Sequence, residues 1–312
     1  LYATPAVHVD VTAVVTNTVP VDAYRGAGRP EAAYSIERLM DTAAREIGMD
    51  PAEFRRKNFI PPFDGVNEPG YQTQVALQYD SGNYEGTLDK VLEVADYEGL
   101  KAEREKARSE GRLMGIGFST YIEACGIAPS AVVGSLGARV GLYDAANIRV
   151  HPTGKVTAHV GAHSHGQGHE TTFAQIIADA FGIGMEDVNI IHGDTENVPF
   201  GMGTYGSRSL AVGGIAIVNA CKKIVTKAKK VAAKMLEASE DEVEFKDGEF
   251  IVAKSNKKKT IGEVAFACYL PGVRDEVKSP LPEGEEPGLK ETSFFNPANF
   301  SFPAGSHIAE VE

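Results

Sequence analysis

The chain opens with apolar and polar residues that alternate over positions 1–20, a pattern that predicts a strand. Further along, apolar residues recur at helical spacing, which predicts helices over residues 31–47, 84–95 and 97–110. The segment Asp50–Glu53 predicts a further short helix, because it combines an N-cap Asp, a Pro at the first helical position and a Glu three residues after the cap. Pro61 and Pro62 end it, and residues 63–83 are expected to be mostly loop.

Beyond residue 110 the pattern turns to strand-like alternation, which predicts strands over residues 113–124, 130–142, 146–151 and 155–160. A helix over residues 168–181, a strand over residues 187–192 and a long helix over residues 207–237 are expected next. The last elements expected are a hairpin over residues 242–252 and a helix that starts with a capping box at Thr260. A long loop over residues 271–300 and a strand over residues 306–312 follow. Strands come in runs with helices between them, which indicates an α+β fold with two domains, 1–110 and 111–312.

Composition narrows the class of protein. The chain has 312 residues, is 43% hydrophobic and carries a formal net charge of −12, so we expect a globular protein that is no general nucleic-acid binder. The lysines between Lys222 and Lys230 have helical spacing and are expected to form a solvated face. The three cysteines, odd in number and far apart, favour a reducing cytoplasm over a disulfide framework. No apolar run approaches the roughly 20 residues of a membrane span.

Two glycine-studded polar loops, each leading into a helix, are the most informative feature. The first holds Gly166, Gln167, Gly168 and His169, and the second holds Gly203, Thr204, Tyr205, Gly206, Ser207, Arg208 and Ser209. Glycine lets a backbone approach a ligand closely, and the first turn of a helix offers unpaired N–H groups. Together with amide, hydroxyl and guanidinium donors, two such helix starts predict a binding site for one large anionic, phosphate-bearing ligand.

Each motif also has a plain structural interpretation. For the first loop this alternative is a plain tight turn before a helix, against which the carboxamide of Gln167 argues. For the second loop the alternative is an ordinary helix start that Ser207 caps. His163, His165 and His169 have a spacing that invites a zinc site, but no carboxylate or thiol pattern completes the set, and loop histidines are the simpler interpretation.

A third glycine turn places Arg25 and Arg29 around Gly26 and Gly28, just before the helix predicted from residue 31. Its functional interpretation is that Arg25 faces a polar substrate or an anionic cofactor. Its structural interpretation is helix capping with exposed ion pairs, which contribute little.

Taken together, these segments resemble the molybdenum-binding large subunit of the xanthine dehydrogenase, aldehyde oxidase and carbon monoxide dehydrogenase family. The resemblance runs from Val21 to Glu312 and keeps the order of the motifs. It implies that Gln167 contacts an oxo ligand of molybdenum, that the Gly203–Ser209 loop holds the pterin and its phosphate or dinucleotide tail, and that Arg25 orients the substrate. It also implies a molybdopterin cofactor, in its cytosine dinucleotide form, with Fe-S and FAD groups on partner chains.

The chain departs from the family pattern in two ways. Gly26 stands where carbon monoxide dehydrogenases carry a copper-binding cysteine, so carbon monoxide is not the expected substrate. An upstream Gly-rich cofactor loop and a downstream general-base glutamate have no counterpart here. Because strand patterns also begin and end the chain, we expect a piece of a larger polypeptide, or a subunit that pairs with other chains.

The function expected from this resemblance is that of a molybdenum hydroxylase subunit or fragment. It would oxidise an aldehyde, an N-heterocycle or a similar small molecule with water as the oxygen source, without a catalytic residue of its own. Two alternatives remain: a non-catalytic assembly fragment without bound cofactor, and a metallohydrolase built on the histidine cluster.

Overall fold

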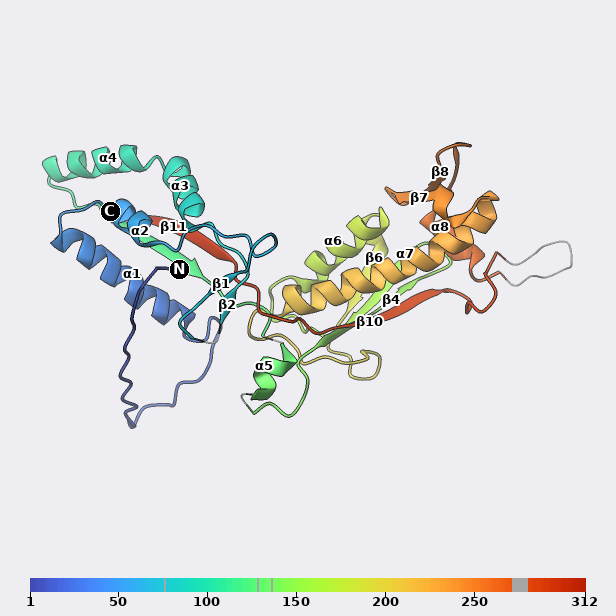
Figure 1. Ribbon diagram of the computed structural model, residues 1–312, viewed down its shortest axis with the longest axis horizontal. Coiled ribbons are helices and arrows are strands. Elements are labelled where there is room, and N and C mark those ends of the chain that lie inside the picture. Colours follow the sequence, from blue (N-terminus) through green and yellow to red (C-terminus); the bar gives the residue numbers. More distant parts are fainter. Residues whose placement is uncertain (76, 128, 136, 271–279) are drawn as a thin grey trace, which may run out of the picture. The chain divides into compact units, whose positions relative to one another are not determined.

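The computed structural model describes residues 1–75, 77–127, 129–135, 137–270 and 280–312, and it confirms the α+β class. The chain forms two compact units (Figure 1). Unit 1 comprises Leu1–Cys125 together with Phe300–Glu312, and unit 2 comprises Gly126–Asn299. Most predicted helices are present close to their expected bounds.

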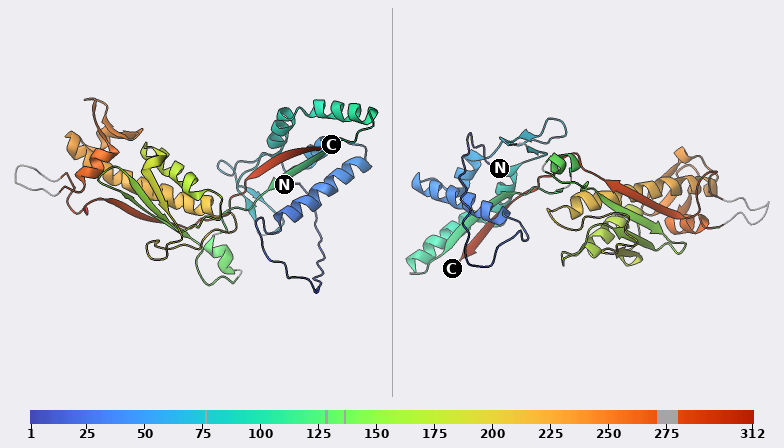
Figure 2. Two further views of the ribbon diagram at one scale, coloured as in Figure 1. Left: turned by 180° about the vertical axis from the view of Figure 1, so that it is seen from behind. Right: turned by 90° about the horizontal axis from the view of Figure 1, so that it is seen from below.

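In the described part of the chain, unit 1 contains four helices and two strand pairs. The helices are α1 (Arg29–Glu46), α2 (Pro51–Asn58), α3 (Tyr84–Val94) and α4 (Tyr97–Ser109). The strands are β1 (Tyr71–Gln72) with β2 (Gln78–Tyr79), and β3 (Gly115–Ile122) with β11 (Ala304–Val311), both pairs antiparallel. Helix α1 packs on β3 and α3 packs on β11 (Figure 2). The predicted cap is confirmed, since Asp50 accepts hydrogen bonds from the backbone N–H groups of Ala52 and Glu53.

A buried charge network holds unit 1 together. The guanidinium of Arg55 on α2 donates to carboxylates of Glu37 and Asp41 on α1, at 2.9 and 2.8 Å, and the Arg55 side chain has no exposed surface. Glu37 also accepts from the backbone N–H of Thr120 on β3 at 2.8 Å and from the hydroxyl of Tyr2. Burial, reinforced by the charge of Glu37, raises the pKa of Tyr2 above its ordinary range. The network joins two helices, a strand and the N-terminal segment.

The strand predicted over residues 1–20 is wrong. Only Tyr2 pairs, as an isolated bridge to Phe59, and the rest of the segment has no strand structure. Val7, Val9 and Val11 are 68%, 69% and 85% exposed. Alternation alone does not make a strand, because its N–H and C=O groups need a neighbouring strand, and no described strand lies beside this segment.

The division of the chain also differs from the predicted boundary near residue 110. The pairing of β11 with β3 returns the end of the chain to unit 1, and this unit continues to Cys125. Strand pairing between segments almost 200 residues apart sets this division, and such pairing cannot be read from local composition.

Unit 2 is organised around a four-stranded mixed sheet. Its spatial order is β10 (Leu289–Phe295), β4 (Asp144–Val150), β5 (Val156–Val160) and β6 (Val188–Ile191). Strands β5 and β6 are parallel and the other neighbours are antiparallel. The connection between β5 and β6 contains α6 (His169–Phe181), so the loop between β5 and α6 begins at the carboxyl end of a central strand. Ligand-binding loops in α/β units commonly begin there.

Unit 2 has further elements besides this sheet and α6. They are α5 (Ser130–Ser135), a π-helix η2 (Ser209–Gly214), α7 (Ile215–Leu236), α8 (Ile261–Ala267), the 3-10 turns η1 (Met185–Asp187) and η3 (Glu240–Glu242), and the antiparallel strands β7 (Val243–Lys246), β8 (Glu249–Val252) and β9 (Lys257–Thr260). Helix α7 contacts α6, β4 and β10, so both long helices cover the same face of the sheet (Figure 1). The predicted hairpin turn at Asp247 and the capping box at Thr260 are confirmed.

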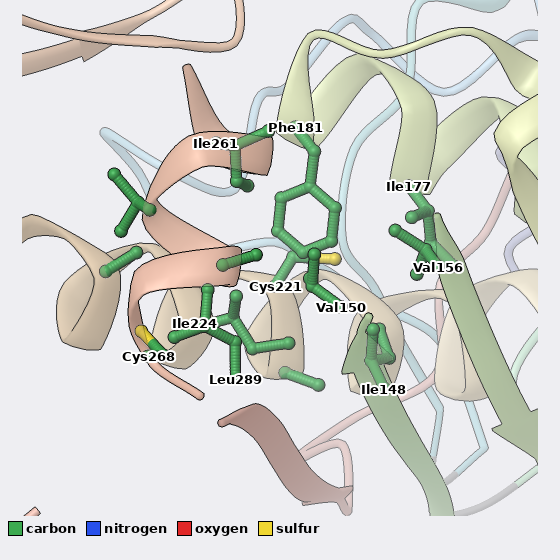
Figure 3. Packing of buried hydrophobic residues seen from close by; sticks show 14 of the residues in the cluster. Ile148, Val150, Val156, Ile177, Phe181, Cys221, Ile224, Ile261, Cys268 and Leu289 are labelled. Carbon is green, nitrogen blue, oxygen red and sulfur yellow. The ribbon is translucent and has the colours of Figure 1, made fainter. Parts of the chain in front are cut away.

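The core of unit 2 lies between that sheet face and α7. Figure 3 shows Phe181, the last residue of α6, pointing toward Cys221 of α7 and Ile261 of α8. Phe181 is fully buried, and Cys221 is 2% exposed. Burial raises the pKa of the Cys221 thiol to about 12. Burial of such side chains is the main favourable term in folding, at roughly 1.5–3 kcal/mol each.

Three further expectations for unit 2 need correction. Residues 130–142 contain α5 rather than a strand, and the expected loop over 271–300 contains β10; its residues 271–279 lie outside the described part of the chain. The lysine run is only partly a solvated face. Lys227 is only 8% exposed. Four lysines of α7 donate hydrogen bonds to carbonyl or carboxylate oxygens of the segment that leads into β10 and of β10 itself, and these are Lys223, Lys227, Lys230 and Lys234.

Residues Ser209–Leu236, which form η2 and α7, are long and apolar enough by length and composition to cross a membrane. Half of the most apolar window is buried inside the unit, and α7 contributes many residues to the main core cluster. The helix is therefore the core helix of a folded unit.

Candidate functional site

The first predicted loop leaves β5 at Gly161 and enters α6 at His169. Gly166 and Gly168 have φ angles of +96° and +79°, a backbone region that favours glycine. Gly168 is the N-cap of α6, and no side chain caps this helix. The first-turn N–H groups of α6 therefore point out of the helix without a side-chain acceptor. The carboxamide oxygen of Gln167 accepts from the backbone N–H of His165, while its nitrogen has no acceptor among the described residues.

The second predicted loop leads into the π-helix η2. Gly203, Gly206 and Ser207 all have positive φ angles, of +76°, +55° and +51°. The hydroxyls of Thr204 and Ser209 are 2.9 Å apart and hydrogen-bonded. π-Helical turns are rare and occur frequently at functional sites.

The two loops lie side by side. The backbone N–H of Gly203 donates to the carbonyl of Gly161 at 3.3 Å, and the N–H of His163 donates to the hydroxyl of Thr204 at 3.2 Å. Close backbone approach makes this possible, because a Cβ on Gly201 would lie 2.4 Å from the Cα of Gly161. The loops that lead into α6 and η2 are thus in direct contact, and the convergence of the two helix starts on a common ligand stays a prediction.

Open space adjoins both loops. A Cβ built on Gly166, Gly168 or Gly203 would have no described atom within 4 Å. Gly161, by contrast, is packed, since a Cβ there would lie 2.0 Å from a carboxylate oxygen of Asp144. The loops thus combine glycines needed for packing with glycines that leave their backbone accessible to a ligand.

Arg208 does not have the exposed position expected for a phosphate ligand. It has no exposed surface and donates to the carbonyls of Gly203, Leu142 and Tyr143, at 3.1, 2.5 and 3.0 Å. Its guanidinium lies 5.5 Å from the ring centre of Tyr205. These hydrogen bonds fix the loop, and a direct contact of Arg208 with an anion stays a prediction. The sequence predicted an exposed Arg208 because Ser207 and Ser209, two further possible phosphate donors, flank it.

Sequence reasoning missed Asp144, the first residue of β4. Its side chain is fully buried, and its carboxylate lies 3.4 Å from the guanidinium of Arg208. Among the described residues, Arg208 is the one basic side chain within 4 Å of this carboxylate. Burial raises the pKa of Asp144 to about 6, although the N–H of Ala145 and the charge of Arg208 act in the opposite direction. Asp144 precedes Arg208 by 64 positions, and no local motif marks it.

The histidines gather near the first loop. His169 is buried, stacks on Phe173 and has an Nδ1 atom without a hydrogen-bond partner. Burial, and secondarily the charge of His192, lowers the pKa of His169. His192, also missed, is hydrogen-bonded to Glu170 at 2.7 Å.

The geometry of this cluster does not support a metal site. His163 and His165 are exposed, and their ring centres are 5.4 Å apart. Within the described ranges, no three His, Cys, Asp or Glu side chains converge in a way that could hold a metal ion. The structure therefore gives the metallohydrolase hypothesis no support.

Arg25 belongs to unit 1, in an exposed turn where Gly26 and Gly28 have φ angles of +96° and +90°. It forms no ion pair with any described residue, and Gly28 caps α1 without a side-chain hydrogen bond. The turn therefore caps α1 through its backbone, without an ion pair from Arg25 to a described residue, and the role of Arg25 stays a prediction.

Two cavities lie away from these loops. One of about 470 Å³ is lined by residues of α2, α3 and α4 in unit 1, and one of about 360 Å³ is lined by loops around Gly154, Gly182, Gly248 and Gly262 in unit 2. Neither is lined by residues of the two glycine loops.

The chain matches a known family along most of its length. Residues 90–312 and residues 1–59 each match a family described as molybdopterin cofactor-binding domain. The carbon monoxide dehydrogenase large chain of Hydrogenophaga pseudoflava is 41% identical over 317 residues, covering 100% of this chain and 38% of that protein. The nicotine 6-hydroxylase large subunit of Paenarthrobacter nicotinovorans is 32% identical, covering 100% of this chain and 37% of that protein.

Solved structures give the same result. The Cu,Mo-CO dehydrogenase crystal structure superposes with a TM-score of 0.78 at 40% identity, covering 91% of this chain and 35% of that chain. Quinoline 2-oxidoreductase from Pseudomonas putida 86 superposes with a TM-score of 0.80 at 32% identity, covering 94% and 36%. The chain thus spans less than two fifths of the length of these relatives.

Proposed function

This chain belongs to the molybdopterin cofactor-binding family of molybdenum-enzyme large subunits, and we propose that its two glycine loops hold part of a molybdenum cofactor in an oxidoreductase of the molybdenum hydroxylase type. The observation that carries the proposal is the pairing of the loops through the Gly203–Gly161 and His163–Thr204 hydrogen bonds. This pairing places the loop before α6 beside the loop before η2.

The residues present fit such a group. The open space beside Gly166, Gly168 and Gly203 admits a ligand to the backbone, and the uncapped start of α6 offers N–H donors to an anion. Gln167 contributes a carboxamide nitrogen that has no acceptor among the described residues, and His169 contributes a buried ring nitrogen without a partner.

The cofactor supplies the redox chemistry when it is bound, and the residues of this chain bind and orient it. In this proposal the backbone of the Gly203–Ser209 loop and the hydroxyls of Thr204, Ser207 and Ser209 hold phosphate groups. Arg208 holds the loop in place through its hydrogen bond to the carbonyl of Gly203.

The finer parts of the proposal concern the cofactor and the partners. We infer the cytosine dinucleotide form of molybdopterin, and Fe-S and FAD groups on partner subunits or domains. The names large chain and large subunit of the relatives imply companion chains, and three cysteines in this chain are too few for a four-cysteine cluster. The cytoplasmic location also belongs to the proposal, and all three cysteines are free thiols.

For the substrate we propose a small organic molecule, such as an aldehyde or an N-heterocycle, oriented by Arg25. Relatives named for nicotine and quinoline support a heterocycle. Gly26 argues against the copper-dependent oxidation of carbon monoxide. Its φ angle is +96°, and a Cβ there would lie 2.8 Å from the ring of Pro30, so a cysteine would be strained in this turn.

Elemental and cofactor analysis of the native complex tests the proposal. Molybdenum and an extractable phosphorylated pterin are expected in the purified complex. The variant Gly168→Leu should lose both, because the added side chain fills the space beside the loop. Gly111→Leu is the matched control, since Gly111 has nearly the same φ angle, +78°, and open space but lies in unit 1. A native complex without molybdenum or pterin would favour the assembly-fragment alternative, and stoichiometric zinc would favour the hydrolase.

A further inference from the structure

The cavity of about 470 Å³ in unit 1 is bordered by the start of α2, the end of α3 and the start of α4. Helix α3 contacts both α2 and α4 (Figure 1). The volume lies within the range of roughly 300–1,000 Å³ that is usual for binding pockets. Neither glycine loop lines this cavity, so the proposed cofactor site does not explain it.

The lining of this cavity, which we call the acidic groove, combines apolar and acidic side chains. Its apolar part consists of Ala52, Leu92 and Tyr97, of which Ala52 is 1% and Tyr97 is 7% exposed. Carboxylates outnumber cations in the rest of the lining, with Asp50, Glu53, Glu93, Asp96 and Glu98 against Arg56 and Lys101. The groove therefore offers apolar contact surface beside an excess of negative charge.

The two cations of the acidic groove already have partners. The ammonium group of Lys101 lies 3.5 Å from a carboxylate oxygen of Asp50, contacts Glu98 and lies 4.7 Å from the ring centre of Tyr97. Arg56 forms an ion pair with Glu53 at 3.2 Å and is shared with two carboxylates of α3 outside the groove. These two cations therefore do not neutralise the remaining carboxylates of the groove.

Helix stabilisation explains only part of this negative charge. The N-caps of α2 and α4 and the glutamates of their first turns lie at the positive ends of these helices, where carboxylates are favourable. Glu93 lies in the last turn of α3, which has no basic residue and where a carboxylate is unfavourable. Its ion pair with Lys90 joins side chains that are 71% and 67% exposed, and such pairs contribute little. The position of Glu93 is therefore not explained by the stability of this chain.

We propose that the acidic groove receives a lysine- or arginine-bearing segment of a companion chain of the complex. The inference rests on the proposed function, which supplies the companion chains. A long basic side chain lays its methylene stem on Leu92 and Tyr97 and brings its charge to Glu93 and Glu98. Complementary charge of this kind steers association and selects the partner. A metal ion is not the occupant, because no three acidic side chains of the described residues are arranged to hold one.

Carboxyl footprinting of the native complex tests whether the acidic groove is covered. A carbodiimide with glycine ethyl ester labels accessible carboxylates, and mass spectrometry measures the labelled fraction at each residue. In this chain Glu93 and Glu98 are 71% and 81% exposed, more than Glu105, which is 57% exposed on α4 outside the groove. At about 0.1 M salt we expect Glu93 and Glu98 to be labelled less than Glu105. At about 1 M salt, where charges are screened beyond about 3 Å, they should be labelled more than Glu105.

Two double variants separate the groove from the general charge of the chain. Glu93→Gln with Glu98→Gln should raise the dissociation constant of the complex about 5- to 30-fold, the effect of one or two ion pairs, as measured by sedimentation. Glu103→Gln with Glu105→Gln removes the same charge from α4 outside the groove and should change the dissociation constant by about 2-fold or less. All four glutamates are exposed, so both double variants should keep the thermal unfolding temperature of the wild type.

The proposal is overturned if Glu93 and Glu98 are labelled more than Glu105 at low salt, or if their protection persists at about 1 M salt, which indicates a cover that does not depend on charge. It is also overturned if the two double variants weaken assembly equally. Protection that appears only after spermidine is added assigns the groove to a free polyamine and overturns it as well. These readouts do not depend on molybdenum, whereas the proposed function fails when the native complex holds no molybdenum or pterin.

Discussion

Among the described residues, each unit contains one fully buried arginine, and the two are held in different ways. In unit 1, Arg55 faces two carboxylates at 2.8–2.9 Å, and Nε, Nη1 and Nη2 all donate hydrogen bonds. In unit 2, Arg208 faces one carboxylate at 3.4 Å, its Nε has no partner, and one oxygen of Asp144 accepts no hydrogen bond. A complete network suits a purely structural role, and an incomplete one lies beneath the proposed ligand loop.

Buried ion pairs are weak evidence for net stability, but removing one partner is strongly destabilising because the other charge is left unpaired. The comparison of Arg55 with Arg208 can therefore be tested by removing each arginine and measuring the loss of stability. The two arginines should respond differently to the same truncation, since they leave different groups behind.

The largest effect is expected for Arg55→Met. It leaves Glu37 and Asp41 buried without a counter-charge, so the free energy of unfolding of unit 1 should fall by about 3–5 kcal/mol. Denaturant unfolding monitored by hydrogen exchange in unit 1 measures this. Arg56→Met is the matched control on the same helix, because Arg56 is partly exposed and its ion pairs should contribute only about 1 kcal/mol or less. Equal losses in both variants would show that burial of the network is not what stabilises the unit.

Arg208→Met should cost less, about 2–3 kcal/mol, and the loss should be concentrated in the loop. The variant leaves three carbonyls without their donor, but the single carboxylate of Asp144 can neutralise itself by protonation. Hydrogen exchange should increase most in residues 203–208 and least in α7. A uniform increase across unit 2 would contradict a loop-specific role.

The sequence was sufficient to predict features that depend on neighbouring residues. The capped start of α2, the β7–β8 hairpin and the two glycine loops follow from spacings of a few residues. Features that depend on distant segments were missed or misjudged. The burial of Arg208 depends on Leu142 and Asp144, and strand β10 depends on its register with β4.

The strand expected over residues 1–20 shows the same limit from the opposite side. Its alternation is real, but strand formation requires backbone partners, and no described strand provides them. Local patterns predict what a segment can become, and contacts between distant segments decide what it becomes.

The pH dependence of unit 2 should reveal the incomplete pair. The folded-state pKa of Asp144, about 6, lies above the ordinary value of 3.8, so the folded state binds this proton more tightly than the unfolded state does. The stability from this group is therefore present below pH 4 and is lost as pH rises through 6, by on the order of 3 kcal/mol. Asp144→Asn should remove this slope, and Asp241→Asn, at an exposed residue, should retain it. Measured unfolding free energies between pH 4 and 7 decide between these outcomes.

The smallest effect, a loss of about 1 kcal/mol in the free energy of unfolding, is expected for Gly203→Ala. This variant tests whether the hydrogen bond from Arg208 to the carbonyl of residue 203 fixes the loop. The added methyl meets no described atom within 4 Å, so the stability cost arises only from the positive φ angle of +76°. If the carbonyl of Gly203 keeps its position, the hydrogen bond from Arg208 survives and protection of residues 203–208 changes little. Ligand binding should nevertheless weaken by more than the stability does, because the methyl occupies the space that the open glycine leaves. Equal losses in stability and in binding would mean that the backbone, rather than the space beside it, matters at this position.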